Sequence, residues 1–207
     1  MLNRVASCSS HRGTNDGMKS TPITLTTSRL QLVEQHVDLA EAISVYRLRN
    51  VAHLAASSPL RPDAYHAVDA WRERLASQVA PLATRATLGF ALQVRSDARV
   101  IGHIDFSQIA RGAFQSCFLG YGIDQDFQGQ GLMSEALAAA IAFAFSTDLH
   151  RIQANHLPDN TRSAAVLAGL GFHIEGHARN YLWINGQWRD HVMTALLNPN
   201  PVIPLLA

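Results

Sequence analysis

The chain has 207 residues, with 17 Lys and Arg against 16 Asp and Glu, a formal net charge of +1; 47% of its residues are hydrophobic and 16% are charged. This length suits one domain, and the apolar fraction is sufficient for a sizeable core, which excludes global disorder. The balanced charge provides no overall attraction to nucleic acid or to a membrane surface, and no apolar run is long enough to cross a bilayer. The two cysteines, Cys8 and Cys117, form no disulfide or metal-binding pattern, so we expect a cytoplasmic protein.

The ends of the chain differ in composition from its middle. Residues 1–20 are rich in Ser, Gly, Asn and Thr, show no periodicity and lack the apolar stretch of a secretory signal, so we expect a disordered leader. Met18 would serve as an alternative start of the chain. Residues 199–207 are broken by prolines and are expected to form a tail. The regular pattern between them predicts one domain at 26–198.

The first half of this domain predicts helices followed by antiparallel strands. "RLQLVE" alternates like a half-buried strand, and "DLAEAISVYRLRN" predicts a helix with Asp38 as N-cap and Glu41 three residues later. A second helix is predicted from Ala64 to Val79. The strands "TLGFALQV", "VIGHIDFSQI" and "SCFLGYGI" follow with short links, which is typical of antiparallel neighbours.

The second half predicts a strand–helix–strand–helix unit and a closing hairpin. "LMSEALAAAIAFAF" reads as a helix, "RIQANHL" as a strand, and "NTRSAAVLAGL" as a helix that ends at Gly171. The Asn185-Gly186 pair suits a type I′ turn between the last two strands. We therefore predict a single α/β (α+β) domain with a mixed, mostly antiparallel twisted sheet and helices on both faces.

The stretch "DFQGQGLM" places Gly129 and Gly131 directly before the apolar helix. Glycines let the main-chain N–H groups turn toward one small volume, and the first N–H groups of the helix add a partial positive charge. Together these predict an anion site that needs no lysine and suits a pyrophosphate. No Gly-Lys-Ser/Thr follows and the third Rossmann glycine is absent, which argues against ATP hydrolysis and nicotinamide binding.

Two more glycines lie on one face of the preceding strand. In "CFLGYGID" the alternation places Gly120 and Gly122 together with Phe118, and Tyr121 with the opposite face. The bare strip admits either a ligand or the close packing of another element, and the sequence leaves both open.

These motifs together resemble the GNAT acetyltransferases, and within them the RimJ/RimL class of ribosomal-protein N-terminal acetyltransferases. The resemblance rests on "TTSRLQLVE", "LGYGIDQDFQGQGLMSEAL", "HRIQANHLPDNTRSAAVLAGLGFHIEG" and "YLWINGQWRDHVMTAL" and runs from Thr26 to Asn198. It implies a splayed strand pair at the cofactor site, acetyl-CoA as the acetyl donor and no metal. The later segments look especially like members that acetylate the N-terminal alanine of a small-subunit ribosomal protein.

The resemblance also implies roles for particular residues. The oxyanion would meet a main-chain N–H near Ile123, Asn160 would hold the cofactor arm, and Ser163 would protonate the departing thiolate. Asp126 departs from the family, which often has Arg or Gln there, and we expect its side chain to point to solvent. The residues implied to bind acetyl-CoA are Gly122, Ile123, Gln128, Gly129, Gln130, Gly131, Leu132, Met133, Asn160 and Ser163.

The general base is not fixed by the resemblance. RimL-like members have a glutamate just before the "YL" strand, where this chain has Asn180, which cannot accept a proton. Asp105, Asp190 and His191 are candidate substitutes, or the amine arrives already neutral, since a terminal amine has a pKa near 8. The ten histidines show no metal-binding spacing.

Three functions remain open: acetylation of a ribosomal-protein N-terminus, acetylation of a small amine such as an antibiotic or polyamine, and non-catalytic acyl-CoA binding in a ribosome-assembly factor. The expected partners are the acceptor N-terminus and the ribosome, without membrane or sequence-specific nucleic-acid binding, and the expected state is a monomer or homodimer. Four arginines in the first half could contact an acidic partner such as ribosomal RNA, but we expect them to solvate helix faces; these are Arg49, Arg61, Arg72 and Arg74.

Overall fold

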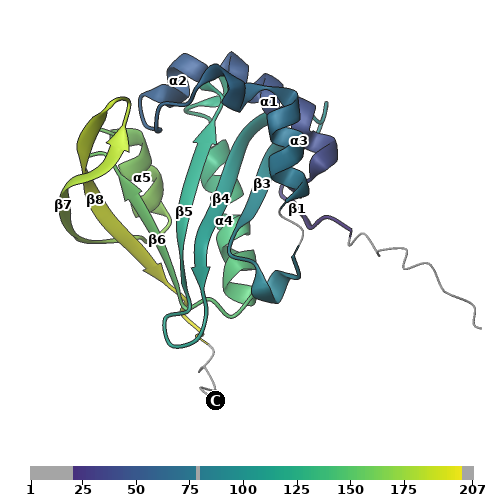
Figure 1. The fold of residues 1–207 in the computed structure, drawn as a ribbon. Helices are drawn as coiled ribbons and strands as arrows, with labels where there is room; N and C mark the ends of the chain where they lie inside the picture. Colours follow the sequence, from purple (N-terminus) through teal and green to yellow (C-terminus); the bar gives the residue numbers. More distant parts are fainter. Residues whose placement is uncertain (1–20, 78–79, 202–207) are drawn as a thin grey trace, which may run out of the picture.

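An eight-stranded sheet in the order β1-β2-β3-β4-β5-β6-β8-β7 organises the chain (Figure 1). The computed structural model describes residues 21–77 and 80–201, so the expected leader at 1–20 and residues 202–207 of the expected tail lie outside the described residues. The strands are β1 Thr24–Thr26, β2 Leu30–Glu34, β3 Leu88–Val94, β4 Val100–Ala110, β5 Ser116–Ile123, β6 Arg151–His156, β7 His173–Ile184 and β8 Gln187–Leu197.

The sheet is mixed, as predicted, because β5 and β6 are parallel while every other neighbouring pair is antiparallel. A crossover is needed between parallel strands, and α4 supplies it. The hairpin between β7 and β8 turns at Asn185 and Gly186, with φ of 47° and 78°. Both are left-handed values, as a type I′ turn requires, so this prediction is confirmed.

Helices cover both faces of the sheet, which Figure 1 shows with α4 and α5 behind it. On that side, α4 packs a continuous apolar core against the strands, including Leu132, Leu137 and Ile141. On the other side, α1 and α3 form a smaller cluster around Tyr46 and Trp71. The helices are α1 Ala40–Arg49, α2 Val51–Ala55, α3 Val68–Ala76, α4 Leu132–Ser146 and α5 Thr161–Gly169, with 3-10 turns η1 Val37–Leu39, η2 Asp63–His66, η3 Leu82–Thr84 and η4 Gln125–Phe127.

Two boundaries differ from the prediction. Asp38 is not an N-cap: it lies within η1, and Leu39 precedes α1 without a side-chain cap, since the chain enters the helix through a tighter turn. The helix predicted from Ala64 to Val79 is divided into η2 and α3, because Ala67 between them is extended, with ψ of 144°. Val79 lies outside the described residues.

The parallel pair β5–β6 is short and then opens. The strands pair only from Ser116 to Phe118 with 151–153, yet β5 continues to Ile123 and β6 to His156. The end of β5 keeps its other neighbour, since Gly102 on β4 is still opposite Ile123. One edge of β5 is therefore left without a strand partner beyond Phe118, which is the splayed pair that the resemblance implied. No helix of the described residues is long and apolar enough to span a bilayer.

Candidate functional site

The loop between β5 and α4 presents bare backbone at the start of a long helix. Gly129 and Gly131 both have φ of 72°, a left-handed conformation that favours glycine. A Cβ on Gly129 would meet nothing within 4 Å, so the volume beside it is open. Gly131 precedes α4 without a side-chain cap, which leaves the first N–H groups of the helix available. The side chains of Leu132 and Met133 are buried, so only their main-chain N–H groups can meet an anion.

Side chains of neighbouring elements hold this loop. Gln128 accepts a hydrogen bond from Arg162 of α5 at 2.7 Å, and its amide nitrogen lies 2.9 Å from Nε2 of His53 in α2. Arg29 donates to the carbonyl of Gln130 at 2.9 Å. The loop is thereby tied to helices on both faces of the sheet and to the start of β2.

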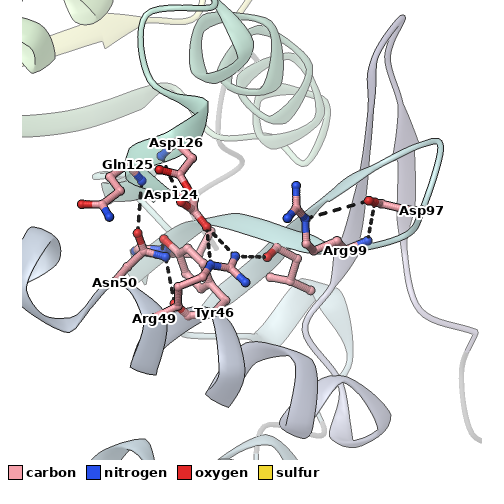
Figure 2. Close-up of polar contacts among 10 residues, drawn as sticks. Tyr46, Arg49, Asn50, Asp97, Arg99, Asp124, Gln125 and Asp126 are labelled. Carbon is pink, nitrogen blue, oxygen red and sulfur yellow. Dashed lines mark hydrogen bonds and ion pairs between the residues drawn. The ribbon is translucent and has the colours of Figure 1, made fainter.

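A buried ion pair anchors the approach to the loop (Figure 2). Asp124, only 1% exposed, accepts hydrogen bonds from Nε of Arg49 at 2.7 Å and from its Nη2. Desolvation raises the pKa of Asp124, but hydrogen bonds from the N–H of Asp126, from Asn50 and from Arg49 outweigh it, and the pKa is lowered. The carboxylate is therefore charged, and it links the end of α1 to the end of β5.

Asn50 adds a second link next to this pair. Its side-chain oxygen accepts from the N–H of Gln125 at 3.1 Å, and its amide donates to the carbonyl of Tyr46 at 3.0 Å (Figure 2). Asp126 is exposed, as expected from its unfavourable charge beside an anion site. Its N–H donates to Asp124 at 3.1 Å, which forms the turn that leads into the glycines.

The two glycines of β5 have different surroundings. A Cβ on Gly120 would meet nothing within 4 Å, so a ligand can lie there. A Cβ on Gly122 would lie 2.5 Å from Cε1 of His103 and 3.1 Å from Leu54, so these side chains fill the space. Of the two interpretations left open, the ligand strip fits Gly120 and close packing accounts for Gly122.

The N–H of Ile123 points toward the open edge of β5. The following N–H, that of Asp124, donates to Ile101 on β4 at 2.7 Å. Successive N–H groups of a strand alternate between its two edges, so that of Ile123 is directed toward β6, where no strand pairs with it. A donor in this position can meet a developing oxyanion.

On the α5 side of β5, Asn160 and Ser163 lie together with Tyr121. Asn160 caps α5, and its side-chain oxygen accepts from the N–H of Ser163 at 3.1 Å. The Ser163 hydroxyl lies 2.7 Å from the Tyr121 hydroxyl rather than bonding to the start of the helix. Burial raises the pKa of Tyr121 to about 12, while the hydrogen bond with Ser163 opposes this. The phenol stays protonated at neutral pH and can donate to the serine.

A cavity of about 210 Å³ lies on the opposite side of β5, between the early helices and β4. Among the side chains that line it, His103 and Asp105 come from β4 and Arg47 from α1. The other lining residues are Val51, Leu54, Ala55, Ser58, Pro59, Leu60, Arg61, Tyr65 and His66. This cavity therefore combines apolar walls with titratable groups, next to the bare Gly120.

Asp105 keeps 42% of its side chain exposed in this cavity. It accepts from Gln35 at 2.9 Å and lies 3.9 Å from Nη2 of Arg47 and from Nε2 of His103. Desolvation raises its pKa, whereas Arg47 and Gln35 lower it, and the net shift is upward. Because water still reaches the carboxyl, this upward shift grows when an occupant excludes that water.

The other candidate bases lie on the closing hairpin. Asp190 accepts a hydrogen bond from the N–H of Asn180 at 2.8 Å, where β7 is irregular and Asn180 has φ of 47°. His191 is buried with its Nδ1 3.1 Å from the carbonyl of Arg189, and burial lowers its pKa. Both side chains therefore contact the backbone of the closing hairpin.

The sequence reasoning missed three groups that the fold brings to the site: Tyr121 beside Ser163, the pair of Tyr46 and His103, and the pair of Arg49 and Asp124. A signal for His103 existed, since alternation along β4 places it on the same face as Asp105. The other contacts join residues that are tens of positions apart in the chain, and no sequence pattern indicates them.

The four early arginines all contact other side chains of the chain. Arg61 and Arg74 lie over the ring of Tyr65, and Arg72 pairs with Asp69 on an exposed helix face. Arg72 therefore lies on a solvated helix face as expected, whereas Arg49 forms the buried ion pair with Asp124. In the described part of the chain, no group of three His, Cys, Asp or Glu side chains is arranged to hold a metal ion.

Comparison with known proteins agrees with this geometry. The acetyltransferase (GNAT) domain model matches residues 29–173. The chain is 41% identical over 179 residues to the ribosomal protein uS5-alanine N-acetyltransferase of Escherichia coli, which covers 86% of this chain and 92% of that protein. The structure of a ribosomal-protein-S5-alanine acetyltransferase from Vibrio fischeri superposes with a TM-score of 0.82 at 34% identity, covering 86% and 98% of the two chains. Mycobacterium smegmatis RimJ in complex with CoA-disulfide gives a TM-score of 0.77 at 30% identity, covering 89% and 92%.

Gly129→Val should abolish most acetyl-CoA binding. The branched side chain would enter the open volume beside the loop, and we expect Kd to rise at least about tenfold, or ~1.4 kcal/mol. Gly112→Val is the matched control: Gly112 has φ of 68°, also meets nothing within 4 Å, and lies in the turn at the far end of β5. Calorimetric titration would contradict the assignment if both variants bound acetyl-CoA equally well.

Asp124→Asn should destabilise the protein and loosen the loop. The substitution leaves Arg49 without its anion, and because Arg49 keeps 34% exposure we expect about 1–3 kcal/mol, below the ~3–5 kcal/mol of a fully buried pair. Asp97→Asn is the control, because it removes the exposed ion pair with Arg99 that Figure 2 also shows. It should change the free energy of unfolding by less than ~0.5 kcal/mol. Equal melting temperatures for the two variants would show that the buried pair stabilises nothing.

Proposed function

Since the chain belongs to the acetyltransferase (GNAT) domain family and is an acetyl-CoA-dependent N-acetyltransferase, we propose that its acceptor is the N-terminal α-amine of a small-subunit ribosomal protein that begins with alanine. The observation that carries this proposal is the 41% identity to the Escherichia coli uS5-alanine N-acetyltransferase, which extends over 92% of that enzyme. The similarity therefore includes the segments around the acceptor cavity as well as the acetyl-CoA loop.

For the acetyl donor, we assign the pyrophosphate to the N–H groups from Gln128 to Met133. The open glycines and the uncapped start of α4 support this assignment. The arm of the coenzyme would follow the open edge of β5 past Gly120 and Gly122, within reach of the Asn160 amide. The acetyl oxygen would then accept a hydrogen bond from the N–H of Ile123, which stabilises the oxyanion.

The reaction needs one proton removed from the ammonium group and one delivered to sulfur. The neutral amine attacks the thioester carbonyl, the C–S bond breaks with its electron pair on sulfur, and the nitrogen loses its second excess proton as the amide forms. We assign delivery of a proton to the thiolate to Ser163. Its contact with the protonated Tyr121 supports this, because the phenol can restore the proton that the serine gives up.

Of the two carboxylates expected near the amine, Asp105 is the one that an acceptor in the cavity would meet. An ionised Asp105 attracts the ammonium group and opposes the positive charge of Arg47. Asp190 would act only if the hairpin released its bond with Asn180. A small first residue such as alanine suits a cavity of about 210 Å³.

The acceptor is tested with peptides and with cells. The purified chain should acetylate a peptide with the N-terminus of the small-subunit protein, and mass spectrometry should find the acetyl group on its α-amine and not on an internal lysine. Ribosomal proteins from a deletion strain should lack the same acetyl group. Turnover of polyamines or antibiotics in place of the peptide would indicate a small-amine enzyme, and binding of acetyl-CoA without any turnover would indicate a non-catalytic protein.

Ser163→Ala should lower kcat by about ten- to a thousandfold with little change in acetyl-CoA affinity. Tyr121→Phe should give a smaller loss, since it removes the partner of the serine and leaves its hydroxyl. Ser146→Ala is the control, because its hydroxyl donates to the carbonyl of Phe143 at the C-terminal end of α4, away from the glycine loop. A Ser163→Ala variant with full kcat would leave the thiolate to be protonated by solvent.

A further inference from the structure

Two polar side chains of β4 face the acceptor cavity and lean in opposite directions. The His103 ring lies over Gly122 of β5, where a Cβ would be 2.5 Å from its Cε1. Asp105 leans the other way, toward β3: a Cβ on Gly89 would be 2.9 Å from its Oδ1, which also accepts from Gln35. The imidazole is therefore the polar β4 side chain that overlies the strand assigned to the acetyl donor.

We propose that His103 accepts the proton of the acceptor ammonium group, and that Tyr46 is the positioning residue that holds its ring. This inference rests on the proposed function, since it assumes that the amine enters the cavity between α1, α2 and β4. It adds a catalytic residue outside the carboxylates and the hairpin histidine that the sequence suggested.

The orientation of the ring follows from its hydrogen bond. Nδ1 of His103 lies 3.1 Å from the Tyr46 hydroxyl, and Tyr46 is only 1% exposed. Nε2 has no hydrogen bond within the described residues, and Oδ2 of Asp105 lies 3.9 Å from it. For Nε2 to accept a proton, Nδ1 must carry the hydrogen and donate it to the oxygen of Tyr46. The proposal thus specifies one tautomer.

Tyr46 is itself held in place from the acetyl-CoA side. Its carbonyl accepts from Asn50, which also binds the N–H of Gln125 at the start of the loop (Figure 2). The same short stretch of α1 therefore contacts the donor loop through Asn50 and the acceptor side through the Tyr46 hydroxyl.

The charges around His103 suit a neutral base. Burial, and then the positive charge of Arg47, hold the pKa of His103 well below its usual value, so the ring is uncharged at neutral pH. Asp105 on the same strand can stabilise the imidazolium after transfer. The other titratable side chains that line the cavity are Arg61, Tyr65 and His66 from the segment before α3. Arg47 also lowers the pKa of an ammonium group bound nearby, which favours the neutral amine.

The proton balance is complete with these groups. One ammonium proton passes to Nε2 of His103, and the free electron pair of the nitrogen forms the bond to the acetyl carbon. The second excess proton of that nitrogen balances the one that the thiolate takes up. His103 returns its proton to water after the acetylated product leaves.

The kinetic test compares His103→Gln, Asp105→Asn and the control His173→Gln, an exposed histidine on β7. Each variant is assayed with the same alanine peptide at saturating acetyl-CoA from about pH 6.5 to pH 9.5, on both sides of the amine pKa near 8. We expect His103→Gln to lose about a hundred- to ten-thousandfold in kcat at the lower pH, and to approach the parent above that pKa, where the amine is already neutral. Asp105→Asn should lose less and keep the pH profile of the parent.

Other kinetic outcomes would overturn the proposal. A loss in His103→Gln that is the same at every pH would indicate a structural role, and no loss would mean that solvent deprotonates the amine. A pH-dependent loss in Asp105→Asn alone would make the carboxylate the base. Failure of the parent chain to acetylate the peptide would instead contradict the proposed acceptor, so the two ideas fail in different experiments.

A measurement without any acceptor tests the ring directly. Nitrogen NMR of the imidazole in the parent chain should show the neutral tautomer with hydrogen on Nδ1, and Tyr46→Phe should shift the tautomer equilibrium and lower kcat while leaving acetyl-CoA affinity unchanged. Hydrogen on Nε2 of the parent ring would overturn the proposal, because that nitrogen could not then accept a proton.

Discussion

The buried carboxylate of Asp124 is the constraint on which both halves of the site depend. A charge that is 1% exposed must be paired and hydrogen-bonded, and Arg49 at the end of α1 provides the counter-charge. The same carboxylate accepts from the N–H of Asp126 and so shapes the turn before the glycines. One ionised group thus fixes the start of the loop assigned to acetyl-CoA relative to the helix that forms a wall of the proposed acceptor cavity.

The site itself arises because two parallel strands separate. If β6 stayed paired with β5 beyond Phe118, it would occupy the N–H and carbonyl groups that a coenzyme arm can use. Their separation leaves an edge with unsatisfied backbone groups, directly before a loop with exposed N–H groups. Extended backbone and helix start then form a continuous surface for one long, phosphate-bearing ligand. The antiparallel pairing of β5 with β4 up to Ile123 keeps this open edge in place.

The sequence predicted the parts of this arrangement that are local. Gly129 and Gly131 precede an apolar helix, and the Asn185-Gly186 turn follows from left-handed backbone that few residues accept. Gly122 shows the limit of such reasoning, because its missing Cβ makes room for His103 on the neighbouring strand, and strand register cannot be read from one chain. The Asp38 cap was wrong because a 3-10 turn precedes the helix and includes Asp38.

The alternation of β5 places the groups proposed for the two proton transfers on opposite faces of the strand. Tyr121 faces α5 and meets Ser163, whereas Gly120 and Gly122 face the cavity with His103. Acetyl transfer needs a proton taken from nitrogen and a proton given to sulfur, and two separate groups can each be held in the protonation state that their own step requires. Opposite faces of one strand provide different surroundings: burial keeps the Tyr121 phenol protonated, and burial with Arg47 keeps the His103 imidazole neutral. The substrate atoms need only lie at the open edge of β5 to reach both.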